Sequence, residues 1–216
     1  MKERILAVGD IHGCYTKLIS LMKRVKINPE KDKLVFLGDY IDRGDQSKEV
    51  VEYLIHLKKE MPSAVFLLGN HEQMLLEYLS RENINSFLIN GGKKTLDSYF
   101  GDGGLSSYQD PKIIFPPEHL EFFNSLFPYY EWKDYIFVHA GLRDGIPLEH
   151  QDSFDLLWIR EDFYFSNFTF GKTVVFGHTP FQQPFIYKQK IGIDTGAAYG
   201  NKLTCVELTA MKFYNA

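Results

Sequence analysis

The feature that most constrains the fold of this chain is a repeated pattern in which a short apolar run stops abruptly at a polar loop, most often at a glycine. Six runs follow this pattern, at residues 5–8, 34–37, 64–68, 135–138, 174–176 and 191–193. Apolar runs of this length with such an ending are typical of buried strands. Strand ends are where α/β proteins keep their chemistry, so we expect the loops to form one site.

The loops after these runs are rich in carboxylates and imidazoles. They read Gly-Asp-Ile-His-Gly at 9–13, Gly-Asp-Tyr-Ile-Asp-Arg-Gly at 38–44, Gly-Asn-His-Glu at 69–72, His-Ala-Gly at 139–141, Gly-His-Thr-Pro at 177–180 and Asp-Thr-Gly at 194–196. Two acids and a guanidinium at one strand end are costly to hold as lone charges. Asp39, Asp42 and Arg43 should therefore find partners in the other loops.

Helical patterns separate the first three runs. Apolar residues recur at helical spacing over residues 15–25, and a second helix, capped by Ser47, extends to the break at Met61-Pro62. A third helix is expected over residues 73–79. Alternating strands and helices predict a largely parallel sheet with the helices outside.

The second half of the chain has a different pattern. Residues 81–128 are interrupted by glycines and prolines, with short amphipathic pieces such as 118–126, and we interpret them as a cap-like excursion over the site. Beyond Tyr129, short apolar runs separated by turns predict mostly β structure. The expected architecture is an α/β fold of two facing β-sheets flanked by helices, in a single domain of residues 1–216.

Composition narrows the function and location. The net charge is −4 for 216 residues, so the chain lacks the general attraction to phosphate backbones that a nucleic-acid binder needs. Cys14 and Cys205 have no metal-type spacing and are expected to be reduced packing residues. Neither a signal peptide nor a membrane span is evident, which predicts a cytoplasmic protein with no membrane partner. A monomer is the default.

The polar loops together supply a candidate metal-binding set. It consists of Asp10, His12, Asp39, Asn70, His139 and His178. Mixed carboxylate, amide and imidazole ligands suit Mn, Fe, Zn or Ni better than Mg or Ca. Six ligands exceed what one open catalytic ion needs, whereas two ions that share a bridging carboxylate would use them all. We expect two divalent ions, with Mn²⁺ the first choice.

These motifs, in this order, resemble the phosphoprotein phosphatase family of calcineurin-like metallophosphoesterases, and in particular its compact bacterial and phage serine/threonine phosphatases. The resemblance extends from Gly9 to about Gly196, and five motifs in order, each after an apolar run, are specific. It implies an αββα sandwich. It also implies that Asp10 and His12 hold one ion, that Asp39 bridges, and that the second ion is held by Asn70, His139 and His178.

The resemblance also assigns catalytic roles. His71 would be the general acid, paired with Asp42, and Arg43 would grip the phosphoryl oxygens. A second phosphate-binding arginine is expected after a tryptophan, which fits Arg160, although Arg160 and Glu161 also suit a surface pair. Independently, phosphoryl transfer needs neutralised charge, a nucleophile at neutral pH and a proton for the leaving oxygen. A bridging metal-bound hydroxide could attack phosphorus directly.

Other polar and aromatic residues have less specific interpretations. Glu72 suits the first turn of a helix, where it complements the dipole, and Asp194 could orient a ligand histidine or simply end a strand. The tyrosine motif that eukaryotic members carry near the site is missing from residues 193–198. The remaining histidines outside the loops are expected to be core residues, namely His56, His119 and His150. The aromatic cluster could be core or a rim that stacks a base or docks a peptide side chain; it consists of Phe163, Tyr164, Phe165, Phe168 and Phe170.

Three functions compete at this point. The first is a serine/threonine protein phosphatase, with dual specificity included, whose partners are phosphorylated proteins or peptides. The second is a symmetrical dinucleoside polyphosphate hydrolase with the same metal centre, diadenosine tetraphosphate being its substrate. The third is a catalytically silent metal-binding scaffold, against which the presence of both His71 and Asp42 argues, because a scaffold needs no proton donor.

Overall fold

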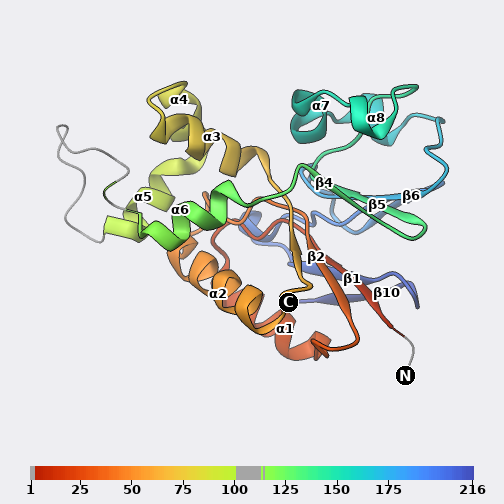
Figure 1. The fold of residues 1–216 in the computed structure, drawn as a ribbon, viewed down its shortest axis with the longest axis horizontal. Coiled ribbons are helices and arrows are strands. Elements are labelled where there is room, and N and C mark those ends of the chain that lie inside the picture. Colours follow the sequence, from red (N-terminus) through yellow and green to blue (C-terminus); the bar gives the residue numbers. More distant parts are fainter. Residues whose placement is uncertain (1–2, 101–112, 114) are drawn as a thin grey trace.

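Two five-stranded sheets lie face to face, with helices on both outer faces (Figure 1). The computed structural model describes residues 3–100, 113 and 115–216. The first sheet has the order β10-β9-β1-β2-β3, with β1 (Ile5–Val8), β2 (Lys33–Phe36), β3 (Val65–Phe66), β9 (Thr204–Glu207) and β10 (Lys212–Asn215). The second has the order β4-β5-β6-β8-β7, with β4 (Tyr129–Trp132), β5 (Tyr135–Val138), β6 (Thr173–Phe176), β7 (Phe185–Tyr187) and β8 (Lys190–Gly192).

Each sheet contains three neighbouring parallel strands, which form one side of the first sheet and the middle of the second. In the first sheet β1 and β3 both pair with β2 in parallel, and in the second β5 and β8 both pair with β6 in parallel. These are the six predicted apolar runs. Parallel strands share the direction in which they end, so the three loops of each sheet open at the same edge. The predicted α/β class with two facing sheets is confirmed.

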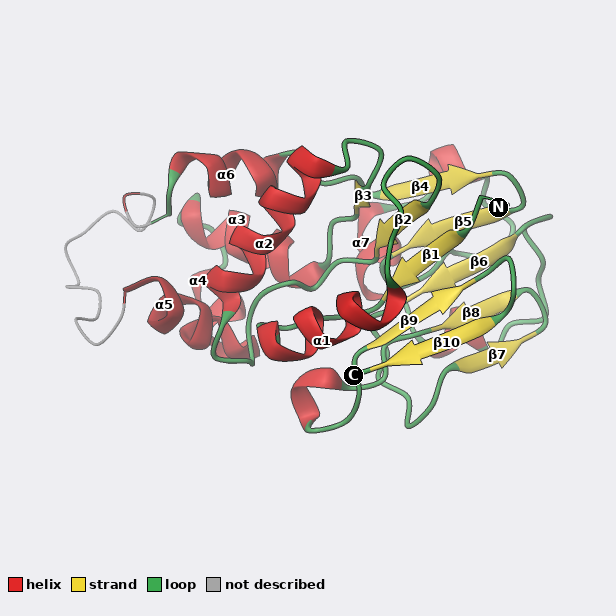
Figure 2. Cartoon of the chain, turned by 90° about the horizontal axis from the view of Figure 1, so that it is seen from below, coloured by secondary structure: helices red, strands yellow, loops and turns green. Residues whose placement is uncertain are grey.

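The packing explains why the strands are apolar along their whole length. In β1, Leu6 and Val8 point into a core beneath the outer helices, whereas Ile5 and Ala7 point into the space between the sheets. A strand that is buried on both faces cannot alternate apolar and polar residues. Figure 2, turned by a right angle, shows the two sets of strands overlying one another. A third core lies between the second sheet and its own helices.

The helices have the following bounds. They are α1 (Tyr15–Val25), α2 (Ser47–Glu60), α3 (Asn70–Leu79), α4 (Ile84–Phe87), η1 (Leu88–Gly92), α5 (Lys93–Phe100), α6 (Pro117–Asn124), η4 (Leu148–His150), α7 (Ser153–Trp158), α8 (Glu161–Tyr164) and η5 (Ala197–Tyr199). Helix α1 has the predicted bounds, and α3 begins three residues earlier than predicted. The prediction that Ser47 caps α2 was wrong: Ser47 is the first helical residue, and its hydroxyl accepts the N–H of Asp42.

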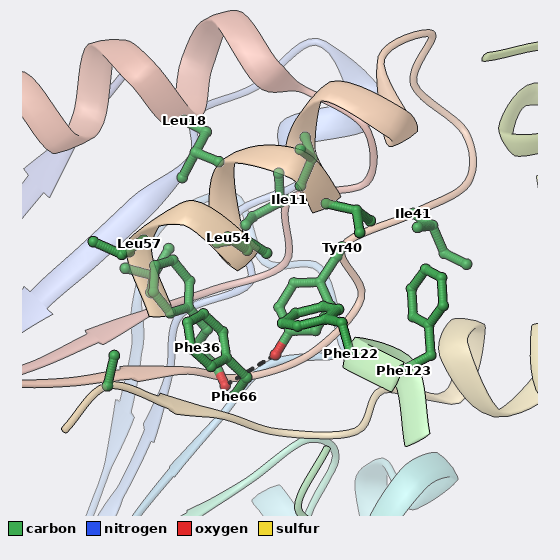
Figure 3. Close-up of a cluster of buried hydrophobic side chains, with 14 of the residues drawn as sticks. Ile11, Leu18, Phe36, Tyr40, Ile41, Leu54, Leu57, Phe66, Phe122 and Phe123 are labelled. Carbon is green, nitrogen blue, oxygen red and sulfur yellow. Dashed lines mark hydrogen bonds between the residues drawn. The ribbon is translucent and has the colours of Figure 1, made fainter. Parts of the chain in front are cut away.

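The core beneath α1, α2 and α6 supports the site from below. Figure 3 shows Phe36, Tyr40, Phe66 and Phe122 gathered there, with the rings of Phe36 and Phe66 stacked at 5.1 Å. The Tyr40 hydroxyl donates to the Leu67 carbonyl at 2.7 Å, so the polar loop that follows β2 is joined to the end of β3.

The predicted excursion over residues 81–128 lies partly outside the described residues, which omit 101–112 and 114. Its described helices α4, α5 and α6 extend from the helical side of the first sheet (Figure 1). The N–H of Arg43 donates to the Gly91 carbonyl, and Thr95 of α5 reaches Asp42. The excursion therefore contacts the loop that follows β2. Among the described residues, no helix is both long and apolar enough to span a membrane.

Candidate metal centre and active site

The loops after five of the parallel strands place histidines and carboxylates within contact of one another. Two groups have ligand atoms that all lie within 4.8 Å of each other. The first ligand group is His12, Asp39 and His71, and the second ligand group is Asp39, His139 and His178. All five side chains are buried. Asp39 belongs to both groups, which is the position that a bridging ligand requires.

The two carboxylate oxygens of Asp39 face different groups. Oδ2 lies 3.3 Å from Nε2 of His12 and 3.9 Å from Nε2 of His71. Oδ1 lies 3.4 Å from Nε2 of His139 and accepts the N–H of His71 at 3.1 Å. One carboxylate thus presents one oxygen to each set of imidazoles.

Backbone carbonyls decide which imidazole nitrogen is free to bind a metal. Nδ1 of His12 is 2.8 Å from the Ile41 carbonyl, and Nδ1 of His139 is 2.8 Å from the Leu37 carbonyl. A carbonyl only accepts, so each Nδ1 carries the proton and each Nε2 presents a lone pair. Both Nε2 atoms therefore turn a lone pair toward the Asp39 carboxylate, an arrangement that a cation between them would stabilise.

Asn70 adds an amide oxygen to the second ligand group. Asn70 is the first residue of α3. Its Oδ1 lies 2.9 Å from Nε2 of His139 and 3.0 Å from Nδ1 of His178. Nε2 of His71 and Nε2 of His178 are buried and have no hydrogen-bond partner within the described part of the chain. Lone pairs facing acceptors, and orphaned buried nitrogens, fit divalent ions.

Burial keeps the candidate ligands in the protonation states that metal binding needs. Burial lowers the pKa of His12 to about 3 and, helped by the nearby His139, the pKa of His178 to about 2, so both rings are neutral at pH 7. For Asp39, burial favours the neutral acid, but the surrounding histidines, His139 foremost, lower its pKa below the usual range. Asp39 is therefore an anion.

Asp10 lies beside the second ligand group but plays a different part in this geometry. Its carboxylate accepts the N–H of His178 at 3.0 and 3.2 Å. Burial, and then the negative charges of Asp194 and Asp39, raise its pKa well above the usual value. A Cβ at Gly177 would lie 2.1 Å from the Asp10 carboxylate, so only glycine permits this approach. Its role as a ligand of the first ion remains a prediction.

His71 lies in the first ligand group and is also held by a carboxylate. Nδ1 of His71 is 2.6 Å from Oδ2 of Asp42, and the hydroxyl of Thr95 donates to Oδ1 of Asp42 at 2.5 Å. Burial alone would lower the pKa of His71, but Asp39 and Asp42 together raise it above its ordinary value. The predicted pairing of His71 with Asp42 is thus present in the geometry.

The two predicted arginines lie beside different ligand groups. Nη1 of Arg43 is 2.5 Å from Nε2 of His12, the nitrogen that a metal ion would also use. Nη1 of Arg160 reaches the hydroxyl of Thr179 at 3.3 Å and the carbonyl of His178 at 3.5 Å. Arg160 therefore borders the second ligand group, and a substrate phosphate between the arginines would meet two guanidinium forks.

Glu72 holds the backbone of the site. Its carboxylate is fully buried and accepts the N–H groups of Asp39, Tyr40, Ile41 and Gly69 at 2.8 to 3.3 Å. It lies in the first turn of α3 as predicted, but its contacts go well beyond a helix dipole. It joins the loop after β2 to the loop after β3.

The site backbone is strained. Five site residues adopt the left-handed conformation that non-glycine residues disfavour, namely His12, Asp39, Asp42, Arg43 and His178. Such residues persist only where the surrounding structure over-determines them, and they cluster at functional sites. Gly69 contributes too, because a Cβ there would lie 2.2 Å from Oδ1 of Asp39.

Several sequence interpretations need correction. His119 is buried, as predicted, and is hydrogen-bonded to the Tyr99 hydroxyl. The prediction that His56 and His150 are core residues was wrong, because both are exposed. Asp194 accepts the N–H of Gly196 within its own turn, which fits a strand end.

The aromatic residues also differ in part from expectation. In the aromatic cluster Phe163 and Tyr164 are core, whereas Phe165 and Phe168 are exposed. Tyr199, just beyond the segment in which no tyrosine was found, lies over the Arg43 guanidinium at 5.4 Å. Trp158 packs edge-on against the His178 ring at 5.8 Å.

The fold and the donor set define a metal-dependent phosphoesterase. A profile of the calcineurin-like phosphoesterases matches residues 3–205, and the chain belongs to that family. The αββα sandwich implied by the sequence motifs is the fold of this family.

Relatives of similar length carry one name. The chain is 29% identical to the asymmetrical bis(5'-nucleosyl)-tetraphosphatase PrpE of Geobacillus sp. strain WCH70, over 93% of this chain and 89% of the relative. It is 27% identical to PrpE of Bacillus cereus strain Q1, over 95% of this chain and 90% of that relative.

Solved structures share the fold. One provisionally described as a diadenosine tetraphosphatase superposes with a TM-score of 0.76 at 22% identity, covering 99% of this chain and 92% of that one. A cold-active protein tyrosine phosphatase superposes with a TM-score of 0.65 at 21% identity, covering 96% of this chain and 74% of that one.

Proposed function

We propose that this protein hydrolyses bis(5'-nucleosyl) tetraphosphates asymmetrically, so that water cleaves diadenosine tetraphosphate into AMP and ATP. The observation that carries the proposal is that PrpE relatives named for this activity match the chain almost from end to end. The sequence alone favoured phosphoproteins, with symmetrical cleavage of the dinucleotide as the alternative. The relatives favour the nucleotide and the unequal cut.

The residues divide the work as phosphoryl transfer requires. Asp10, His12, Asp39, Asn70, His139 and His178 would hold two divalent ions, Mn²⁺ being our first choice. When bound, the ions would neutralise phosphoryl charge and lower the pKa of the attacking water. Arg43 and Arg160 would orient the phosphoryl oxygens with their planar forks.

A second candidate function rests on the pairing of His71 with Asp42. A carboxylate at Nδ1 fixes the tautomer and favours the protonated ring, which leaves Nε2 ready to donate a proton. A nucleotide is a good leaving group, whereas a serine alkoxide cannot leave without a proton. This pair therefore also supports a serine/threonine phosphatase that acts on phosphorylated proteins, with phosphotyrosine as a further substrate.

Product analysis tests the two candidates directly. Purified protein with Mn²⁺ is given diadenosine tetraphosphate or a phosphoserine peptide at equal concentration, and the products are separated by anion-exchange chromatography. We expect AMP and ATP in equal amounts and a higher kcat/KM for the nucleotide. Formation of ADP alone would overturn the asymmetrical cut. Preference for the peptide would support the second candidate, and bound metal without any turnover would support a silent scaffold.

A further inference from the structure

A small aromatic pocket lies beside the second ligand group. Its volume is about 200 Å³, and its walls include Leu68, Gln73, Pro128, Phe154 and Trp158. Phe154 is 66% exposed, and its ring lies nearly parallel to that of Trp158, at 6.3 Å and 19°. Because Trp158 also contacts the His178 ring, this pocket begins where the second ligand group ends.

A larger pocket lies beyond Arg43. Its volume is about 460 Å³, and its walls include Pro180, Gln182, Thr195, Tyr199 and Asn201. Tyr199 is 63% exposed and lies over the Arg43 guanidinium. Arg43 contacts His12, so Tyr199 borders the first ligand group in the way that Trp158 borders the second.

The two aromatic surfaces are thus separated by the candidate metal centre. His12 faces Oδ2 of Asp39, whereas His139, the neighbour of His178, faces Oδ1. Two arginines supply positive charge between the aromatic surfaces. A nucleobase can stack on an exposed aromatic face, whatever the base, because every base has a π-face.

We propose that the Phe154–Trp158 pair and Tyr199 are two nucleobase-binding platforms, one for each end of a dinucleoside tetraphosphate. The inference rests on the proposed function and adds the residues that select the substrate. A ligand with anionic phosphates in the middle and a flat base at each end matches the arrangement of charge and rings. Gln73 and Asn201 line the two pockets. Their amide nitrogens donate to Oε1 of Glu77 and to the Gln182 carbonyl, so their amide oxygens are the groups that can accept a hydrogen bond from a base edge.

Kinetics of single alanine variants test the platforms. Each of Phe154→Ala and Tyr199→Ala should raise KM for diadenosine tetraphosphate roughly tenfold, the usual scale for losing one stacked base. Phosphoserine, which has a phosphate but no ring, should lose far less in kcat/KM. The matched control is Phe165→Ala, which removes an equally exposed phenylalanine, 64% exposed, and should leave KM for the nucleotide unchanged.

Fluorescence gives a readout that does not depend on turnover. The chain has two tryptophans, so Trp132→Phe leaves Trp158 as the only indole. AMP that stacks on Phe154 and Trp158 should quench its fluorescence, and adding Phe154→Ala should weaken AMP binding by a similar factor. Metal content and thermal midpoint are measured for each variant, so that a misfolded variant is recognised.

The outcomes separate this inference from the proposed function. If the wild type cleaves the nucleotide but both variants keep its KM, the platforms are wrong and the function stands. A larger effect from Phe165→Ala would place the base on the aromatic cluster instead and overturn the inference. If the wild type does not cleave the nucleotide, the proposed function fails, and AMP quenching that is sensitive to Phe154 still supports the first platform. Absence of quenching would count against it.

Discussion

The Nδ1 atom of His71 lies 2.6 Å from Oδ2 of Asp42, and both side chains are completely shielded from solvent. Asp42 is itself fixed, because Thr95 donates to its other oxygen and its N–H donates to both Thr95 and Ser47. A carboxylate held so firmly orients the imidazole and favours its charged form. Nε2 of His71 then points toward the space shared with Asp39.

The first prediction is that His71→Asn discriminates between leaving groups. If His71 supplies the proton, the substitution should slow hydrolysis of phosphoserine, whose leaving group is an alkoxide, far more than hydrolysis of nitrophenyl phosphate. The rate on phosphoserine should fall by about 100-fold or more, within the usual range for general acids. Rates on a phosphoserine peptide and on nitrophenyl phosphate give the comparison. Metal content should remain that of the wild type, because an asparagine at 71 leaves the predicted ligands in place.

The control for this prediction is His56→Asn, the same substitution on the exposed face of α2, which should change neither rate. Loss of metal in His71→Asn would instead identify His71 as a ligand of the first group, as its position near Asp39 permits. Equal rate losses on both substrates, with full metal content, would show that His71 is not the general acid.

The second prediction concerns the shared carboxylate. Asp39→Asn should weaken both ions together, because one of its oxygens faces each ligand group and the substitution removes the negative charge from both. Metal per chain, measured after gel filtration, is the observable. Asp134→Asn, at an exposed turn, serves as the control. A variant that retains one ion fully while losing the other would show that Asp39 does not bridge.

The third prediction is that Arg43 acts through its shape as well as its charge. Arg43→Ala should lower kcat/KM for every phosphoester, and Arg43→Lys should restore little, because an ammonium cannot reproduce the guanidinium fork. Arg24→Ala, which loses only an exposed contact with the Asn215 carbonyl, should match the wild type. Wild-type rates in Arg43→Lys would mean that charge alone suffices. The same pair of substitutions at Arg160 tests its assignment as the second phosphate-binding arginine.

The fourth prediction is that Glu72 stabilises the fold. Glu72→Ala leaves several buried backbone N–H groups without an acceptor, and each costs about 1–3 kcal/mol, so the free energy of unfolding should fall by about 3 kcal/mol or more. Urea denaturation measures the change. Glu52→Ala, at an exposed position of α2, should alter stability by less than about 0.5 kcal/mol. A similar loss of unfolding free energy in both variants would show that the hydrogen bonds of Glu72 do not stabilise the fold.

The parts of the site that the sequence predicted share one property: their signals are local. An apolar run followed by Gly-Asp or Gly-Asn marks a strand end wherever it occurs, and this was enough to locate Asp10, Asp39 and Asn70. The same local periodicity would have corrected His56, which lies two positions after buried Leu54 and so on the opposite face of α2.

The residues that the sequence did not reveal act through contacts distant in the chain. Thr95 resembles any other helical threonine until the fold brings α5 against Asp42. Tyr199 gives no signal because its partner, Arg43, is far away in sequence. The hydrogen bonds of Glu72 to the loop after β2 could not be predicted either, because the sequence indicates only that Glu72 lies in the first turn of a helix.

The division of ligands between the two sheets has a consequence for how the protein acquires its ions during synthesis. The members of the first ligand group all lie within the first sheet's loops, and the last to be translated is His71. The second ligand group cannot be completed until His178, at the end of β6, has been made. The first ligand group is therefore complete in the nascent chain well before the second, although the first sheet itself is finished only when β9 and β10 have also been made.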